Sequence, residues 1–208
     1  MPTYKKVDIE TWHRKVHYSI FKDYLQPQYS ISFELDITNF YKKIKENKWS
    51  FTFALIYAIT KCANEIEEFR YRFEDGEVVL YEDLNVSFTY LNKETELLKN
   101  VVVEMDEDIQ KFIDRATEVE KNQKEYFTGP MGNEIYQFSA IPWISFTHIS
   151  HTDLGKKYNA VPMFDWGKFF ERDGKMILPF SVQAHHSFVD GIHMGKLAQK
   201  LQSYLDQF

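Results

Sequence analysis

The stretch that decides the fold is Met176-Ile177-Leu178-Pro179-Phe180-Ser181-Val182-Gln183-Ala184-His185-His186, followed by Ser187-Phe188-Val189-Asp190-Gly191. Residues 176–186 place apolar side chains on alternate positions, which predicts a strand with one face against the core. Gly191 permits a tight turn after it. Residues 192–205 then carry apolar side chains at helical spacing. The sequence therefore predicts a strand that turns directly into a C-terminal helix.

Two adjacent histidines and an aspartate lie at the predicted turn. If the strand alternation holds to its end, His186 shares the apolar face and points toward the covered interior, whereas His185 points away. We therefore prefer His186 as a reactive imidazole, a general base held by its surroundings. Asp190 is interpreted either as the N-cap of the last helix or as a buried carboxylate, and the two roles are compatible. A buried carboxylate needs a partner, usually Arg, which the local sequence does not identify.

The remaining pattern predicts many strands and a few long helices. Strands are predicted for residues 30–36, 70–73, 78–81, 86–91, 101–104 and 163–170, and helices for residues 51–69 and 106–124. Residues 135–147 indicate a strand pair or one long bent strand, residues 129–132 a break, and residues 148–162 a loop. Asp75-Gly76 and Asp173-Gly174 predict hairpin turns. We expect a single α+β domain over residues 1–208, a two-layer sandwich in which helices cover one side of a mixed sheet.

Composition excludes several classes of function. The net charge of −6 disfavours nucleic acid, whose phosphates require a basic surface. Cys62, the one cysteine, lies on a predicted buried helix stripe and is interpreted as a packed thiol, so neither a disulfide nor a Cys-based zinc site is expected. The start lacks a signal-peptide core, and no apolar run approaches the ~20 residues of a membrane helix, so a cytoplasmic protein is expected. The 17% aromatic content fits either a core or an apolar pocket or interface.

Residues 185–193 read His-His-Ser-Phe-Val-Asp-Gly-Ile-His. This run resembles the His-His-Ala-Val-x-Asp-Gly-Phe-His with which the chloramphenicol acetyltransferases of the trimeric type end. Residues 178–183 resemble the strand before that motif, and residues 138–143 resemble an Ile-Ser-Ala-x-Pro-Trp segment. Residues 92–96 resemble a Gln-Glu-Thr-Glu stretch, and Trp12 and Arg14 an N-terminal Trp-x-Arg. The order and spacing match over nearly the whole chain.

The resemblance implies a catalytic mechanism. Family members bind acetyl-CoA as co-substrate together with a hydroxyl acceptor, on a fold shared with other CoA-dependent acyltransferases. By resemblance, His186 removes the hydroxyl proton, and Ser139 stabilises the oxyanion formed at the thioester carbonyl. Asp190 is implied to pair with Arg14. The family is a homotrimer with active sites between subunits, so His186 is expected to face a pocket on a neighbouring chain.

The resemblance also implies binding residues. On the CoA side these are Trp143 beside the pantetheine arm and Lys168 and Phe169 near the nucleotide. On the acceptor side they are Phe21, Tyr29, Leu98 and Asp165. Three of the acceptor positions depart from the family: Asp165 replaces Thr and adds a charge, Phe21 replaces Tyr and loses a hydroxyl, and Leu98 replaces an aromatic residue.

Three alternatives stay open. The same acetyl transfer could act on a different hydroxyl acceptor, with weak or no chloramphenicol activity. A metal site could use histidines of the C-terminal motif or His148 and His151, although adjacent strand residues such as His185 and His186 point to opposite faces and do not easily share one ion. A non-catalytic binding protein could have kept the fold.

Overall fold

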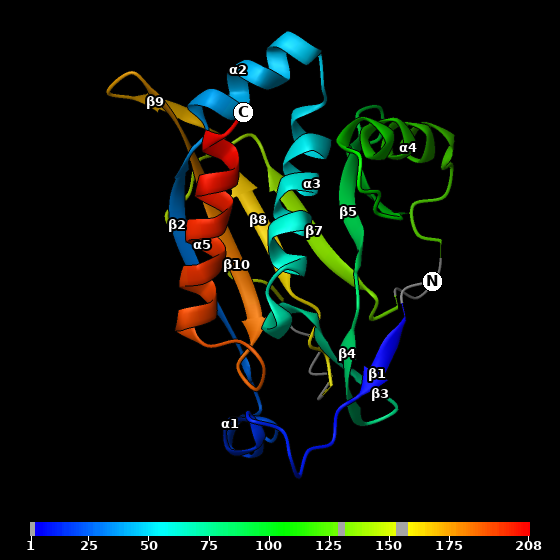
Figure 1. The fold of residues 1–208 in the computed structure, drawn as a ribbon. Coiled ribbons are helices and arrows are strands. Elements are labelled where there is room, and N and C mark those ends of the chain that lie inside the picture. Colours follow the sequence, from blue (N-terminus) through cyan, green and yellow to red (C-terminus); the bar gives the residue numbers. More distant parts are fainter. Residues whose placement is uncertain (1–2, 129–131, 153–157) are drawn as a thin grey trace.

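A seven-stranded mixed sheet forms the centre of the chain. The computed structural model describes residues 3–128, 132–152 and 158–208 (Figure 1). The order across the sheet is β2 (Gln28–Asp36), β10 (Lys175–His185), β8 (Met163–Gly167), β7 (Ile135–Ile141), β5 (Asn85–Asn92) and β6 (Leu97–Val103), with β9 (Phe170–Arg172) paired to β10. Among the strand pairs of the described residues, only β7–β8 and β5–β7 are parallel. A smaller sheet has the order β1 (Tyr4–Lys6), β4 (Glu77–Tyr81) and β3 (Tyr71–Glu74).

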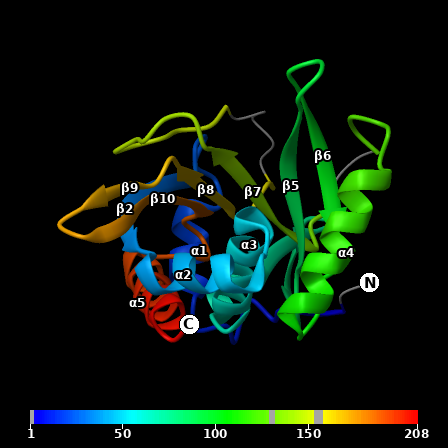
Figure 2. The same ribbon diagram turned by 90° about the horizontal axis from the view of Figure 1, so that it is seen from above.

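Helices cover one face of the large sheet. The chain contains α1 (Lys15–Phe21), α2 (Thr38–Asn47), α3 (Phe51–Asn64), α4 (Ile109–Asn122), α5 (Gly191–Asp206) and the short 3-10 helix η1 (Glu67–Arg70). Figure 2 shows α2, α3 and α5 on one side of the sheet and the segment after β7 on the other. The predicted α+β two-layer architecture is confirmed. Within the described part of the chain, no helix combines the length and apolar character needed to cross a membrane.

The two faces of the sheet differ sharply in chemistry. On the helix-covered face, Phe138, Phe164 and Phe180 are fully buried and stack against one another across β7, β8 and β10. The helix α3, with ten buried residues, packs against this face, and Ser50 caps its start by accepting a hydrogen bond from Phe53 N. The opposite face is polar. The aromatic content of the sequence therefore serves mainly as core.

Both Asp-Gly pairs lie in hairpin turns, as the sequence predicts. Asp75 and Gly76 (φ 51° and 83°) join β3 to β4, and Asp173 and Gly174 (φ 53° and 77°) join β9 to β10. Positive φ at both central residues is what a two-residue type I′ turn requires. Cys62 is buried, as predicted for a packed thiol, and burial raises its pKa to about 12.

Several predicted boundaries are wrong for local reasons. The helix predicted over residues 51–69 ends at Asn64. Phe69 is still buried, but it lies in η1, so the spacing of buried apolar residues continues past the end of the helix. The strand prediction for residues 135–147 fails beyond Ile141, because Pro142 has no N–H to extend a ladder. Residues 163–170 divide into β8 and the start of β9. Residues 129–131 of the predicted break and residues 153–157 of the predicted loop lie outside the described residues.

Three elements were not predicted. The strand β1 is exposed throughout, the helix α1 has no buried residue, and α2 buries only Phe40 and Ile44. The elements β1 and α1 are too short to show a period, but Phe40, Tyr41 and Ile44 of α2 follow helical spacing, a signal that the sequence prediction missed.

The side chain of Arg72 joins the two sheets. It lies in β3, is fully buried, and donates to the carbonyl oxygens of Phe69, Tyr71, Asn133 and Ile135 at 2.8–2.9 Å. Burial lowers the pKa of this guanidinium to about 10. Carbonyl dipoles therefore hold the charge and fix the small sheet against the start of β7.

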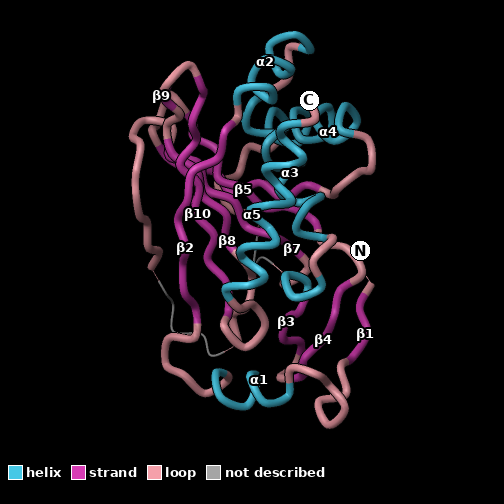
Figure 3. Tube along the Cα trace, turned by 60° about the vertical axis from the view of Figure 1, so that its left-hand side comes forward, coloured by secondary structure: helices cyan, strands magenta, loops and turns pink. Residues whose placement is uncertain are grey.

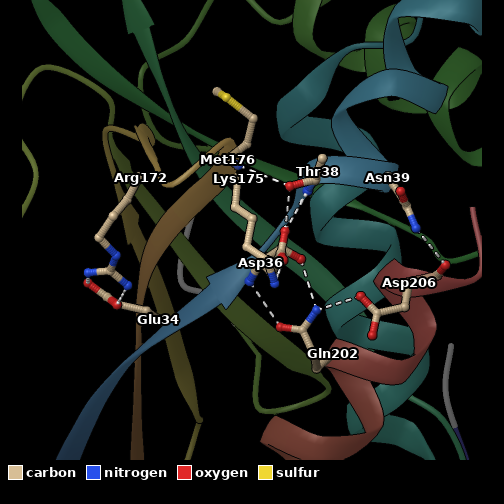
Figure 4. Close-up of polar contacts among 9 residues, drawn as sticks. All are labelled: Glu34, Asp36, Thr38, Asn39, Arg172, Lys175, Met176, Gln202 and Asp206. Atoms are coloured by element: carbon tan, nitrogen blue, oxygen red, sulfur yellow. Dashed lines mark hydrogen bonds and ion pairs between the residues drawn. The ribbon is translucent and has the colours of Figure 1, made fainter.

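A polar network closes the end of the molecule at which β2 enters α2 (Figure 4). The Asp36 carboxylate accepts from Thr38 N and Oγ1 at 3.0 and 2.6 Å and lies 2.8 Å from Lys175 Nζ. Gln202 of α5 bonds both the N–H and the carbonyl of Asp36 at 3.0 and 2.9 Å. These contacts with Lys175 and Thr38 lower the pKa of Asp36 to about 2, against the opposing effect of burial.

The Asp36 network predicts an acid-sensitive contribution to stability. Because the folded pKa lies below the ordinary 3.8, the stabilisation is present above about pH 4 and is lost as the pH falls toward 2. Asp36→Asn should lower the free energy of unfolding by about 1 kcal/mol at pH 7, after allowance for solvent screening. Urea unfolding from pH 7 to pH 2 should show this difference vanish at the acid end. Glu34→Gln, which removes the exposed pair with Arg172, is the matched control and should change little; an equal loss in both variants would contradict the assignment.

Candidate active site

A tight turn after β10 carries the two histidines. His186 N donates to Pro27 O at 2.8 Å, and the N–H groups of Phe188 and Val189 both donate to His185 O at 3.0 Å. The Phe188 side chain is buried and packs against Trp12, Tyr71 and Phe73. The packing of Phe188 against these aromatic side chains thus holds the turn in place.

The burial of the two histidines is the reverse of the sequence prediction. His185 is 1% exposed and packs against Phe73 and Phe188, while the His186 side chain is 35% exposed. The alternation fails because β10 ends at His185 and His186 already belongs to the turn. Burial lowers the pKa of His185 to about 4. His185 is therefore a neutral packing residue, and His186 is the imidazole that a substrate can reach.

The His186 ring lies among three side chains. The Phe21 ring stacks on it at 4.0 Å and 3°, and Tyr29 lies at 4.7 Å. His186 Nδ1 is 3.2 Å from Asp190 Oδ1, within ion-pair distance although the two atoms are not aligned for a hydrogen bond. The ring plane is set by the aromatic neighbours and Nδ1 faces Asp190, which leaves Nε2 as the nitrogen available to a substrate.

An ion pair ties Asp190 to the N-terminal segment. Arg14 Nη1 donates to Asp190 Oδ2 at 2.8 Å, and Arg14 Nε donates to Ser187 O at 3.4 Å. The Arg14 side chain is 6% exposed and that of Asp190 is 23% exposed. Burial opposes ionisation of Asp190, but the Arg14 guanidinium outweighs it and lowers the pKa of the carboxyl. The partner implied by the family resemblance is therefore in contact.

The backbone around Asp190 is also held. Asp190 N donates to His193 Nδ1 at 2.9 Å, and His193 Nε2 lies 3.3 Å from Glu68. Asp190 is the N-cap residue of α5. The chain turns directly after β10 as expected, but the turn does not depend on Gly191, which has no positive φ and begins α5, where a Cβ would meet nothing within 4 Å.

Ser139 lies on the polar face of the sheet. The register places Ser32, Ser181, Asp165 and Ser139 side by side across β2, β10, β8 and β7. Ser32 Oγ donates to Ser181 Oγ at 3.1 Å. The half-buried Ser139 hydroxyl makes no hydrogen bond to any described residue. It is therefore free to donate to a substrate.

Asp165 is fully buried and contacts His151, in the segment after β7. Asp165 Oδ1 lies 2.9 Å from His151 Nε2, within ion-pair distance although the two atoms are not aligned for a hydrogen bond. Burial raises the pKa of Asp165, and the carboxylate contact raises the pKa of His151. From the sequence, His151 is predicted only as a candidate metal ligand. A carboxylate between Phe164 and Trp166, in a strand otherwise buried, was the signal that a cationic partner was needed.

One chain does not bring Ser139 and His186 together. From Ser181 to His185, where β10 ends, the strand advances roughly 13 Å, and Ser139 lies two strands or roughly 10 Å to the side, so the backbone of Ser139 is roughly 16 Å from the start of the turn that carries His186. A base and an oxyanion donor that act on one transfer step must lie much closer.

The expected CoA-side residues are partly grouped. Lys168 N donates to Ile144 O at 2.8 Å, which brings Lys168 beside the segment of Trp143, itself 60% exposed. A Cβ on Gly167 would lie 2.9 Å from Ile144 O, so glycine is needed for this approach. The Phe169 ring instead packs on Tyr41 and Phe51, between α2 and α3.

Other expected residues lie apart. Leu98 is 48% exposed on β6, at the sheet edge far from β10.

Two surface cavities of about 640 and 510 Å³ flank α3, but neither is lined by His186 or Ser139. Among the residues that the structure describes, no three His, Cys, Asp or Glu side chains are grouped to hold a metal ion.

Solved structures define the class of fold. A chloramphenicol acetyltransferase matches with a TM-score of 0.90 and 28% identity, covering 98% of this chain and 100% of that chain. A probable dihydrolipoamide acetyltransferase from Listeria monocytogenes 4b F2365 matches with a TM-score of 0.65 and 15% identity, covering 98% and 94%. The fold is that of the CoA-dependent acyltransferases.

Sequence relatives define the family. A family model described as chloramphenicol acetyltransferase matches residues 2–202. Chloramphenicol acetyltransferases from Klebsiella sp and Proteus mirabilis are 31% and 30% identical, over 99% and 97% of this chain and 95% and 94% of their own lengths. The chain belongs to the chloramphenicol acetyltransferase family.

The Arg14–Asp190 pair predicts non-additive effects on stability. Asp190→Asn should lower the free energy of unfolding by about 3 kcal/mol, because an uncompensated guanidinium stays buried. Arg14→Met combined with Asp190→Asn should recover part of that loss, since no charge then remains unpaired. Urea unfolding of the two single variants and the double variant, at one protein concentration, measures the coupling. Additive losses would show that the pair does not stabilise the turn.

Proposed function

We propose that residues 1–208 form one acetyltransferase domain that transfers an acetyl group from acetyl-CoA to the hydroxyl group of a small molecule, chloramphenicol being the first candidate. The observation that carries this function is the accessible His186 imidazole, stacked on Phe21 and held against Asp190, in a chain of this family. We also propose a cytoplasmic location, where acetyl-CoA is supplied.

His186 acts as the general base in this proposal. Its Nε2 takes the proton of the acceptor hydroxyl while the hydroxyl oxygen attacks the thioester carbonyl carbon. The carbonyl oxygen becomes an oxyanion, to which Ser139 donates a hydrogen bond, a contribution of roughly 3 kcal/mol. Collapse of the intermediate breaks the C–S bond, and the CoA thiolate takes the proton from His186. Asp190 stays ionised against Arg14 and orients the imidazole.

Acetyl-CoA is the proposed co-substrate, and part of the chain suits it. The exposed Trp143 ring offers an apolar surface to the pantetheine arm, and Lys168 beside it offers a positive charge to a phosphate. The Phe169 ring packs against Tyr41 of α2 and Phe51 of α3, which argues against direct contact between Phe169 and the nucleotide.

We further propose that the protein acts as a homotrimer with active sites between subunits. The separation of Ser139 from the turn that carries His186 in one chain supports this, because a second copy could bring its Ser139 to that His186. Apolar side chains of α1 and of the segment after it also remain uncovered: Val16 and Ile20 are 64% and 49% exposed, and Leu25 is fully exposed. An exposed group of this kind marks an interface or a binding site.

A second candidate function keeps the transfer but takes a different alcohol. Asp165 and its partner His151 add charge near Ser139, and Phe21 offers no hydroxyl to an acceptor. A site that lacks a matching hydrogen-bond partner can lose large factors in specificity.

Loss of the His186 imidazole should lower the turnover rate without weakening the binding of CoA. His186→Gln should lower kcat at least ~100-fold, the low end for loss of a general base, with the affinity for CoA unchanged. Release of free thiol from acetyl-CoA with chloramphenicol, and with a panel of hydroxylated compounds, is the assay. His13→Gln, an exposed histidine, is the control. Undiminished turnover by His186→Gln would exclude the proposed base.

Mixing two inactive variants should restore activity. His186→Gln and Ser139→Ala are each expected to be inactive, but in a mixed oligomer about a quarter of the interfaces would combine an intact His186 with an intact Ser139. Co-expression and assay of the mixed species therefore should give a substantial fraction of wild-type activity. Activity no higher than that of either variant alone would place both groups in the site of one chain.

A further inference from the structure

The polar face of the sheet carries a second histidine–carboxylate contact beside Ser139. Asp165 lies opposite Ser139 on β8 in register, so the two side chains project from neighbouring strands to the same side. The Asp165 side chain is 1% exposed, and both carboxylate oxygens are buried. His151 reaches the carboxylate from the segment that crosses this face (Figure 2).

His151 presents its outer edge away from the carboxylate. Nε2 faces Asp165 at 2.9 Å, and Nδ1 makes no hydrogen bond to a described residue. The His151 side chain is 20% exposed, whereas Asp165 is sealed beneath it. The imidazole edge, and not the carboxylate, is therefore the part of this pair that a ligand can reach.

The electrostatic surroundings of His151 differ from those of His186. The carboxylate beside His186 is already neutralised by Arg14. Among the described residues, Asp165 has only His151 as a charged partner, and its neighbours in register, Ser139 and Ser181, are neutral. A buried carboxylate with one available partner favours the charged imidazolium. The pKa of His151 is raised by that contact, against the effect of burial.

We propose that His151, fixed by Asp165, is a cationic recognition group of the acceptor pocket and selects alcohols that carry a negatively charged group. The proposal rests on the proposed acetyl transfer, in which Ser139 of this chain lines the pocket, and it favours the second candidate function, because chloramphenicol carries no negative charge. The imidazolium Nδ1–H donates a charge-assisted hydrogen bond to the anionic group while the acceptor hydroxyl is directed to His186 of the partner subunit. His151 is a binding residue in this role and does not transfer the reacting proton.

Two matched primary alcohols test the selection. The probes are 4-(hydroxymethyl)benzoate, which is an anion at pH 7, and 4-(hydroxymethyl)benzamide, which is neutral and of similar shape. Thiol release from acetyl-CoA gives kcat/KM for each. The wild-type protein should prefer the benzoate at least ~10-fold, as expected for one charge-assisted contact. His151→Gln should reduce that preference to ~2-fold or less by raising the KM for the benzoate, with the KM for acetyl-CoA unchanged.

The pH profile separates charge from structure. The preference of the wild-type protein for the benzoate should fall as the pH rises through the pKa of His151, whereas His151→Gln should show no such change. Asp165→Asn should shift this transition to lower pH, because the imidazolium loses its counter-charge. His148→Gln, an exposed histidine of the same segment, is the matched control and should behave as wild type. Unfolding temperatures of the variants report whether any effect comes from loss of the fold.

The outcomes distinguish this inference from the acetyl transfer itself. Equal kcat/KM for the two probes, or the same preference in wild type and His151→Gln, overturns the inference, as does turnover of chloramphenicol with neither probe accepted. If no alcohol is acetylated at all, the proposed function fails. The inference is then decided by NMR titration of His151, whose pKa should rise on addition of the benzoate and not of the benzamide; no rise overturns it.

Discussion

The ion pair between Arg14 and Asp190 is the interaction on which the candidate site depends. It connects the N-terminal segment to the turn between β10 and α5 across nearly the whole sequence. That turn carries His186, and the helix α1 that begins after Arg14 delivers Phe21 to the face of the imidazole. The pair is largely shielded from water, so removal of one partner leaves the other as an unpaired buried charge. One contact therefore sets the position of the imidazole, its carboxylate neighbour and its stacking partner.

The second constraint is the division of the sheet into an aromatic face and a polar face. Stacked phenylalanines under α3 stabilise the scaffold, and Arg72 locks the small sheet onto it through carbonyl groups. The polar face carries Ser139 and Asp165, and a polar sheet face of this kind is stable only when water or another surface meets its groups. The rigid core holds this face in register, and the chemistry proposed for it needs a second copy of the chain.

Much of the fold could be predicted from the sequence, because local rules govern it. The Asp-Gly turns and the α5 stripe depend on neighbouring residues alone, and the structure has them where the sequence predicts. The end of β10 could not be predicted, since the change from strand to turn at His186 depends on a bond to Pro27. The partner of Asp165 and the distance from Ser139 to His186 depend on strand order, which alternation does not reveal. For Arg14, only the family resemblance indicated the contact.

The central claim is that two copies of the chain share one site, with His186 from one and Ser139 from the other. An experimental structure of the assembled protein with bound CoA measures this directly, as the distance between His186 Nε2 and the nearest Ser139 Oγ of another subunit. The account predicts a separation of about 8 Å or less, which spans one hydroxyl oxygen and one thioester carbonyl. A separation above about 15 Å at every interface, with the pantetheine thiol bound away from both groups, would contradict it.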